Sequence, residues 1–340
     1  MSINRTRFAG LRRQRGRSLL ELMIALVIGF IILSAVMLTS VGNGGASRRQ
    51  DSLTTLNEDA LIATSIITNQ LRLAGYSRFT GQPVPNSSGM ADLAFKYRNY
   101  NGPPVRGCDG GMKNYGVLMT NINCNGGNGA DGFMVAYEAD TRNTFPTLTQ
   151  PNNPTDCLGA SLPAQVPSES GGGGTYFQVE NIFYVDRTTN SLMCSGSGNL
   201  GQPQPLIGNV IDMQVLYGVA AMQAPTPGVD QVPLFEAQQY LTAAEIDQLP
   251  ILPAGTLPAE RGRWTRVVSM RVCLVLRSPT ELYDAITPYT GCNGQQVTPA
   301  DRRAYRAVTI TTAFKNRTAP CADASAAPAQ PRASLDRCAF

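Results

Sequence analysis

The 340-residue chain is 43% hydrophobic and only 15% charged, so it can bury a sizeable core in one or two domains and is not a disordered protein. Residues 1–16 hold five of the 28 Lys and Arg and none of the 24 Asp and Glu, which leaves the remaining chain at 23 minus 24, or −1. The formal net charge of +4 therefore belongs to the amino-terminal segment, and charge gives no support to nucleic-acid binding.

The first predicted element is an apolar helix over residues 19–41. Glu21 is the only charged residue of this segment, and about 23 helical residues span roughly 34 Å, enough to cross a bilayer. Six arginines and no acid precede Glu21, which predicts a cytoplasmic amino end and an extracytoplasmic location for everything after Ser40. A cleavable signal peptide is one alternative, but its apolar region is usually only about 7 to 15 residues long. A plain signal anchor that tolerates an acid also stays open.

The carboxylate of Glu21 is the unusual feature of this span. An acid in the apolar interior costs about 2 to 3 kcal/mol on insertion scales, so it is treated as functional when a partner can be named. The basic leader ending in Gly16, followed by RSLLELMIALVIGF with Glu21 as the fifth residue after that glycine, resembles the processing site of type IV prepilins.

This resemblance implies a processing step and a partner. A prepilin peptidase would cut between Gly16 and Arg17 on the cytoplasmic face and methylate the new amino terminus. The terminal ammonium of a neighbouring subunit would then pair with Glu21 as helices pack into a fibre, a buried ion pair that fixes register. Arg17 departs from the family pattern, in which the residue after the cut is usually Phe.

A second helical segment follows over residues 46–75. Apolar residues recur there at steps of three and four, which predicts an amphipathic helix that packs on a globular domain. They are Leu53, Leu56, Ala60, Ala63, Ile67, Leu71 and Ala74. Gly42, Gly44 and Gly45 predict a soft spot where the helix bends, or restarts with Ser47 and Gln50 as a capping box. Gly75 is the predicted stop.

The region after the helix reads as loop-rich β structure. From residue 86 to about 174 short runs such as LAFKY, GVLMTNI and GFMVAYEA alternate with turn residues, and SESGGGG at 168–174 is a predicted connector. Stronger strand candidates are TYFQVENIFYVDR, LIGNVIDMQVLYGV, TRVVSMRVCLVLRS and RAVTITTAFKNR. Between them, Thr242 and Glu245 form a predicted capping box for a short helix that stops at Pro250.

Eight cysteines lie beyond the apolar segment, and an even number in a translocated domain indicates disulfides in an oxidising compartment. They are Cys108, Cys124, Cys157, Cys194, Cys273, Cys292, Cys321 and Cys338. Sequence cannot choose among the roughly one hundred possible pairings, and the working expectation is that each cysteine pairs with the next along the chain. The absence of His and of any Cys-x-x-Cys pair argues against a zinc site.

The chain lacks the sequence signatures of catalysis. Without His there is no Ser-His-Asp triad, and neither a phosphate-binding loop nor a nucleophile elbow occurs. Gly127, Gly129 and Gly132 form a Gly-x-Gly-x-x-Gly that precedes a strand, so it is interpreted as a turn. Calcium-loop spacing is absent around it. We expect no enzymatic activity, no cofactor and no metal.

Several short sequence blocks point to one family within the type IV pilins. LRLAGY, GADGFMVAYEA, CLG, IDMQVLYGV, MRVCLVLRS and RRAYRAVTITTAFKNR, in this order, are similar to PilW-type minor pilins of the type IV pilus assembly system. The resemblance implies an α+β fold of the type IV pilin class, in which a long amino-terminal membrane-spanning helix packs on an antiparallel β-sheet domain with long loops. The expected divisions are a leader at 1–16, an assembly helix at 17–45, its amphipathic continuation at 46–75, a β-rich domain at 76–318 and a disulfide-tethered tail at 319–340.

Three functions compete. The leading one is a minor pilin that helps to prime pilus assembly and sits in the tip complex, with other minor pilins, the major pilin, a tip adhesin and the prepilin peptidase as partners. It would be held in the inner membrane by a single pass before it moves to the pilus at the cell surface, with its globular domain periplasmic or extracellular. A pseudopilin J-like tip component of type II secretion is the alternative. A membrane-anchored secreted enzyme is the third, and the absence of catalytic motifs from the sequence argues against it.

Overall fold

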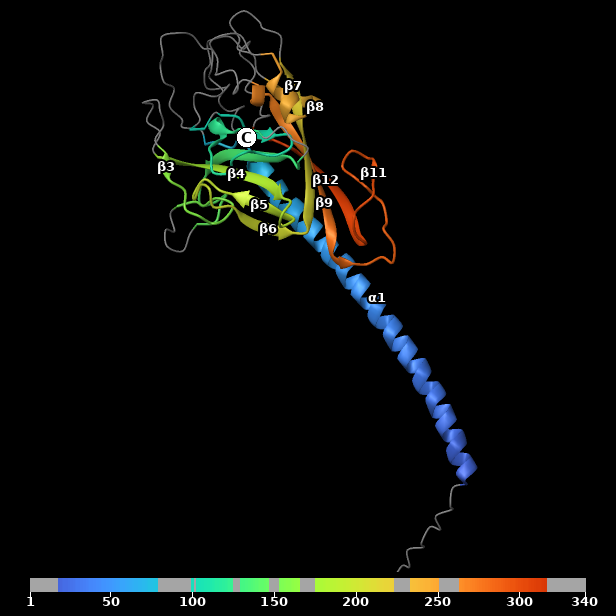
Figure 1. The fold of residues 1–340 in the computed structure, drawn as a ribbon. Helices are drawn as coiled ribbons and strands as arrows, with labels where there is room; N and C mark the ends of the chain where they lie inside the picture. The colour runs from blue at the N-terminus through green and yellow to red at the C-terminus, as the bar shows by residue number, and fades with distance from the viewer. Residues whose placement is uncertain are drawn as a thin grey trace, which may run out of the picture. The chain divides into compact units, whose positions relative to one another are not determined.

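The computed structural model describes residues 18–78, 99–100, 102–124, 129–146, 153–165, 175–222, 233–250 and 263–316. The chain divides into two units, Met1–Asp51 and Ser52–Phe340. Helix α1 (Leu19–Leu73) contributes residues to both units, and the described strands all belong to the second (Figure 1). The expected architecture, a long apolar helix followed by antiparallel sheets, is confirmed.

In the first unit, Leu19–Leu38 of α1 is long and apolar enough to cross a membrane, with a mean hydropathy of 2.7. The helix continues through Gly42, Gly44 and Gly45, so the restart considered at Ser47 is wrong. A helical glycine costs about 1 kcal/mol relative to alanine but keeps its N–H for the backbone ladder, which is why three glycines do not end the helix. Bending during assembly stays a prediction.

In the second unit, α1 buries one face against the sheets. Leu56, Ala60, Ala63, Ile67 and Leu71 are all buried at the predicted helical spacing. Leu53 is 39% exposed and does not belong to this face, in contrast to the prediction. The helix ends as expected: Gly75 has a φ of 70°, and its N–H donates to the carbonyl of Ala136 at 2.8 Å, which ties the helix end to the first sheet.

The first sheet has the strand order β1-β2-β4-β5-β6, with neighbouring strands antiparallel and β3 paired to β4. The strands are β1 (Val105–Cys108), β2 (Gly132–Ala139), β3 (Ala164–Gln165), β4 (Tyr176–Asp186), β5 (Ser191–Ser195) and β6 (Gln204–Gly208). Strand β2 is buried on both faces because Phe133, Val135 and Tyr137 join the main core, whereas Met134 and Ala136 join a second cluster. The run GVLMTNI, a predicted strand, contains instead the 3-10 helix η1 (Met119–Asn121).

The second sheet has the order β12-β9-β7-β8, again antiparallel. Its strands are β7 (Val210–Met222), β8 (Pro233–Leu241), β9 (Val267–Glu281) and β12 (Arg303–Ala313). The predicted segment LIGNVIDMQVLYGV is divided between the two sheets at Asn209, whose φ of 60° turns the chain from β6 into β7. The short helix α3 (Ala243–Asp247) begins with the predicted Thr242–Glu245 capping box. A small hairpin joins β10 (Tyr289–Thr290) to β11 (Gln296–Val297).

Three disulfides join described residues of the second unit, and each links a cysteine to the next one along the chain. The pairs are Cys108–Cys124, Cys157–Cys194 and Cys273–Cys292. Each closes a loop of 16 to 37 residues, which in the chain-entropy model stabilises the fold by about 3 to 4 kcal/mol. Cys321 and Cys338 lie outside the described residues, as do the tail from 319 onward and the connector at 168–174.

Candidate functional site

The first turn of α1 carries the candidate assembly residue. The Ser18 carbonyl accepts from the N–H groups of Glu21 and Leu22, at 3.0 and 3.2 Å, so the helix starts just before Leu19. Glu21 lies in this first turn, where the positive end of the helix dipole favours an acid by about 0.3 to 1 kcal/mol at an exposed position. Its side chain is exposed and thus accessible to a partner. Gly16 and Arg17, the predicted cleavage and methylation positions, lie outside the described residues.

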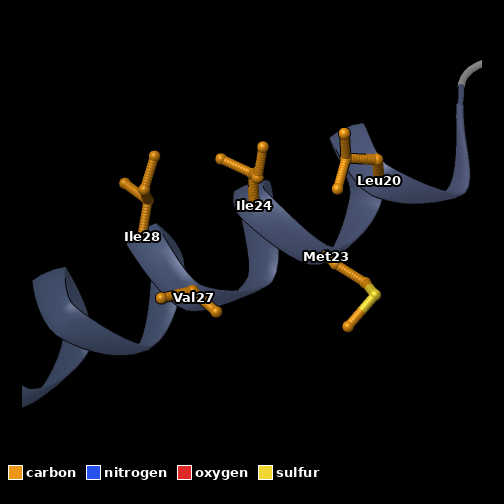
Figure 2. Close-up of a pocket in the computed structure, with 5 residues that line it drawn as sticks. All are labelled: Leu20, Met23, Ile24, Val27 and Ile28. Atoms are coloured by element: carbon orange, nitrogen blue, oxygen red, sulfur yellow. The ribbon is translucent and has the colours of Figure 1, made fainter.

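The helix beyond Glu21 presents a continuous apolar surface. Leu20, Ile24 and Ile28, spaced by four residues, point to the same side of the helix, and Met23 and Val27 lie beside them (Figure 2). Each of these five side chains is between 51% and 66% exposed within this unit. Such a surface is stable only against lipid or other apolar helices, because burying each large aliphatic side chain stabilises by about 1.5 to 3 kcal/mol.

In the second unit, buried polar contacts fix α1 on the sheets. Gln70 of α1 accepts at Oε1 from Asn181 of β4 at 2.9 Å and from the Tyr137 hydroxyl of β2 at 3.3 Å. Burial raises the pKa of Tyr137, so this hydroxyl stays protonated and donates. Ser52 and Thr280 share a hydrogen bond of 2.9 Å nearer the start of this part of the helix. A helix held by specific polar partners has one register on the sheets.

Asp131 is a polar residue that joins the two sheets. Its carboxylate accepts from the N–H groups of Gly110 at 2.9 Å and Val215 at 2.8 Å, and its own N–H donates to the carbonyl of Met213 at 2.8 Å. Burial raises the pKa of Asp131 to about 6, against the lowering effect of these two N–H donors. No local sequence pattern predicts this role, because the residue looks like an ordinary turn aspartate before β2.

The described residues do not assemble a metal site. No group of three or more Cys, Asp or Glu side chains in this part of the chain is placed to hold a metal ion. Of the glycine motif, Gly129 and Gly132 precede and open β2, whereas Gly127 lies outside the described ranges. The Asp131 oxygens next to this turn are occupied by backbone donors, which leaves them unsuited to calcium.

Comparison with known proteins gives two family matches in separate parts of the chain. Residues 182–316 match the family described as type IV pilus-assembly protein W, and residues 11–37 match the prokaryotic N-terminal methylation motif. The first covers strands β5 to β12, and the second covers the predicted cleavage position and the start of α1. No curated protein matches the sequence.

Among solved structures, the chain is similar to the type IV-like pilin TTHA1219 from Thermus thermophilus. The two are 11% identical, the match covers 77% of this chain and 98% of that one, and the TM-score is 0.36. A TM-score this low transfers no feature of that protein to this chain. The chain is thus similar to the type IV pilus-assembly protein W family over most of its sheets and to the N-terminal methylation motif at the start of α1.

Proposed function

We propose that the protein is a minor pilin, a non-enzymatic subunit that helps to prime type IV pilus assembly and takes its place in the tip complex. The observation that carries the proposal is the combination of Glu21 in the first turn of an exposed apolar helix with a match to the pilus-assembly family over residues 182–316. That family match favours the pilus over the type II secretion alternative.

Processing comes first in this proposal. The apolar segment of α1 holds the chain in the inner membrane with its arginine-rich end in the cytoplasm, and a prepilin peptidase cuts after Gly16 and methylates Arg17. The methylation-motif match over residues 11–37 includes both positions and supports this step. The three disulfides support a periplasmic or extracellular location for the β-rich part, since such bonds persist in oxidising compartments.

Assembly follows from the cost of burying Glu21. When apolar helices pack, the Glu21 carboxylate leaves water, and an unpaired charge there is strongly unfavourable. The ammonium group released by cleavage on a neighbouring major or minor pilin has the opposite charge and lies four residues before the matching Glu21, near the same membrane depth. Pairing the two groups sets the axial register between neighbouring helices. The disulfide-braced sheets form the surface that contacts a tip adhesin.

The experiment is replacement of Glu21 in cells that make pili. Glu21→Ala removes the charge but leaves the leader intact, so we expect normal cleavage with the mature chain retained in the membrane and lost from sheared pili. Glu21→Asp keeps the charge on a shorter side chain and is the matched control, with partial recovery of incorporation expected. Equal amounts of Glu21→Ala and wild-type protein in sheared pili would refute the pairing role.

A further inference from the structure

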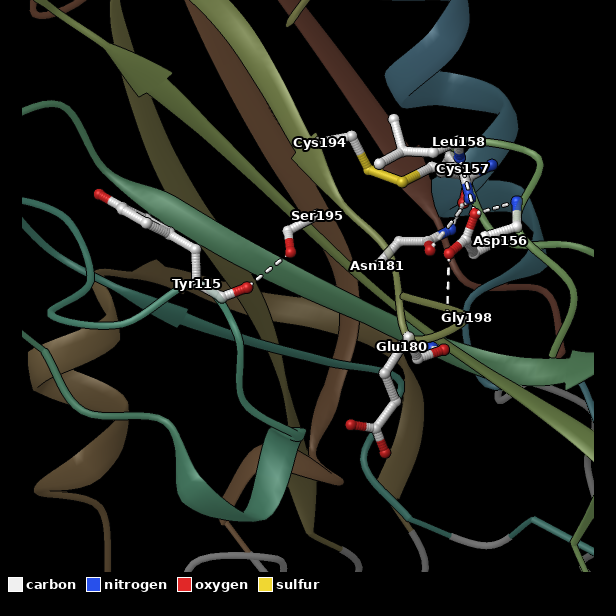
Figure 3. Close-up of a disulfide and its surroundings, with 12 residues drawn as sticks. Tyr115, Asp156, Cys157, Leu158, Glu180, Asn181, Cys194, Ser195 and Gly198 are labelled. Atoms are coloured by element: carbon white, nitrogen blue, oxygen red, sulfur yellow. Dashed lines mark hydrogen bonds between the residues drawn. A yellow bond between two sulfur atoms is a disulfide. The ribbon is translucent and has the colours of Figure 1, made fainter. Parts of the chain in front are cut away.

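The loop of residues 153–163, which carries Cys157, is connected to helix α1 through the buried side-chain amide of Asn181. Cys157 is bonded to Cys194 of β5, and its backbone N–H donates to Oδ1 of Asn181 at 3.2 Å. The Nδ2 group of Asn181 in turn donates to Oε1 of Gln70 at 2.9 Å. Asn181 lies beside the disulfide in Figure 3 and is fully buried. Only Asn181 therefore stands between the Cys157–Cys194 disulfide and Gln70 of the helix.

The orientation of the Asn181 amide depends on Cys157. The side-chain amide of Asn181 has an oxygen that accepts and an NH2 group that donates. Because the Cys157 N–H donates to the oxygen, the NH2 group is directed toward Gln70. If the Cys157 N–H moves away, the buried oxygen of Asn181 loses its partner, and an unpaired buried polar group destabilises the arrangement that contains it. The Asn181–Gln70 bond is therefore coupled to the position of Cys157.

The Cys157 loop behaves as one compact piece. The buried Asp156 carboxylate accepts from the N–H groups of Leu158, Ala160 and Gly198, at 2.9, 3.0 and 2.9 Å (Figure 3). The bonds from Leu158 and Ala160 are internal to the loop. The bond from Gly198 joins the loop to the segment that follows β5. The loop is thus rigid in itself, and the Cys157–Cys194 disulfide is the covalent bond among its attachments to the first sheet, which also include the buried side chain of Leu162 and the pairing of β3 with β4.

We propose that the Cys157–Cys194 disulfide is a redox-sensitive latch that holds the carboxyl-terminal turns of α1 in register on the first sheet. The latch concerns how the helix is held and does not depend on the pilus role proposed above. A dithiol reductant opens it: one thiolate attacks Sγ of the half-buried Cys157, the S–S bond breaks, and Cys194 leaves and takes up a proton. The second thiol of the reagent then releases Cys157 as a thiol, and the reagent is oxidised to its own disulfide.

The test is hydrogen exchange of the full-length protein in detergent micelles. In the double variant Cys157→Ser/Cys194→Ser we expect the amides of residues 64–73 to exchange about tenfold faster, the scale set by one unpaired buried group. The matched control is Cys108→Ser/Cys124→Ser, because Cys108 packs in the second cluster on the opposite face of β2 from the helix. Exchange that stays unchanged, or that rises equally in both variants, would overturn the proposal.

A reciprocal measurement keeps the proposal testable if either serine variant fails to fold. Coupling between two sites acts equally in both directions, so weakening the helix contact must make the disulfide easier to reduce. Gln70→Met removes the acceptor with little change in volume and leaves all cysteines intact. We expect dithiothreitol to reduce Cys157–Cys194 about tenfold further at equilibrium in this variant, with Cys108–Cys124 unaffected, as read by thiol alkylation and peptide mass spectrometry. Equal reduction of Cys157–Cys194 in Gln70→Met and wild-type protein would contradict the latch.

Discussion

The sharpest prediction concerns the pH dependence of stability at Asp131. Its pKa is about 6 in the folded chain and 3.8 as an ordinary aspartate, so the folded state binds the proton more tightly than the unfolded state. The stabilisation from protonated Asp131 is fully present below pH 4 and is lost as the pH rises through 6. A difference of about 2.2 units corresponds to about 3 kcal/mol of unfolding free energy, an order-of-magnitude figure.

The assay uses Asp131→Asn, which abolishes titration at this position. The amide oxygen of Asn accepts one of the two backbone N–H groups, but its NH2 group faces the other and cannot accept it. This mismatch lowers the unfolding free energy by about 1 to 3 kcal/mol at every pH. Guanidinium unfolding of the full-length chain in detergent, followed by fluorescence, gives the free energy. Trp264, the only tryptophan, is fully buried and packs edge-on against Tyr217 at a ring distance of 4.9 Å, so it reports on this region.

The predicted result is that the stability of the wild type relative to Asp131→Asn falls by about 2 kcal/mol between pH 4 and pH 7, because only the wild type titrates at this position. Asp186→Asn is the control: hydrogen bonds from Thr188 and Thr189 lower the pKa of Asp186, so its contribution to stability changes with pH in the opposite direction. A wild-type minus Asp131→Asn difference that does not vary with pH would refute the reasoning.

Two further variants test other parts of the structure. Gly16→Leu blocks the predicted cleavage position, so we expect a precursor that does not shift on a gel, and a normally shortened product would exclude this site. Gly107→Ala places a methyl group against the hydroxyl of buried Tyr217, which costs about 1 to 3 kcal/mol of unfolding free energy by overpacking. The Tyr217 hydroxyl has no hydrogen-bond partner within the described ranges, so Tyr217→Phe alone costs little. It removes the atom nearest to the new methyl group but keeps the ring carbon Cζ, so we expect partial rescue of Gly107→Ala, and no rescue in a denaturant titration would disprove the contact.

Local signals predicted much of the fold. The apolar run predicts the first turns of α1, the three- and four-residue spacing predicts its buried face from Leu56 to Leu71, and the Thr242–Glu245 pair predicts the start of α3. These features depend on residues close in sequence, whose geometry is set by helix periodicity and capping. Pairing each cysteine with the next one succeeded for the three described bonds because each closes a short loop beside antiparallel neighbours.

Long-range partners escaped prediction because no local pattern encodes them. Asn181 and Gln70 are 111 residues apart, and Asp131 and Val215 are 84 apart, so only the assembled sheets bring them together. The division of one apolar run into β6 and β7 likewise depends on Asn209, which adopts a left-handed conformation that a strand pattern does not reveal. The polar pair Glu180 and Asn181 inside strand β4 is a signal that could have indicated a buried polar contact, but no prediction used it.

The central claim is that this chain is matured into a pilus subunit whose Glu21 meets a freed amino terminus. Mass spectrometry of the amino-terminal peptide from membrane and sheared-pilus fractions tests it most directly. We expect a mature chain that begins with methylated Arg17. Native protein that still begins at Met1 in both fractions would contradict it.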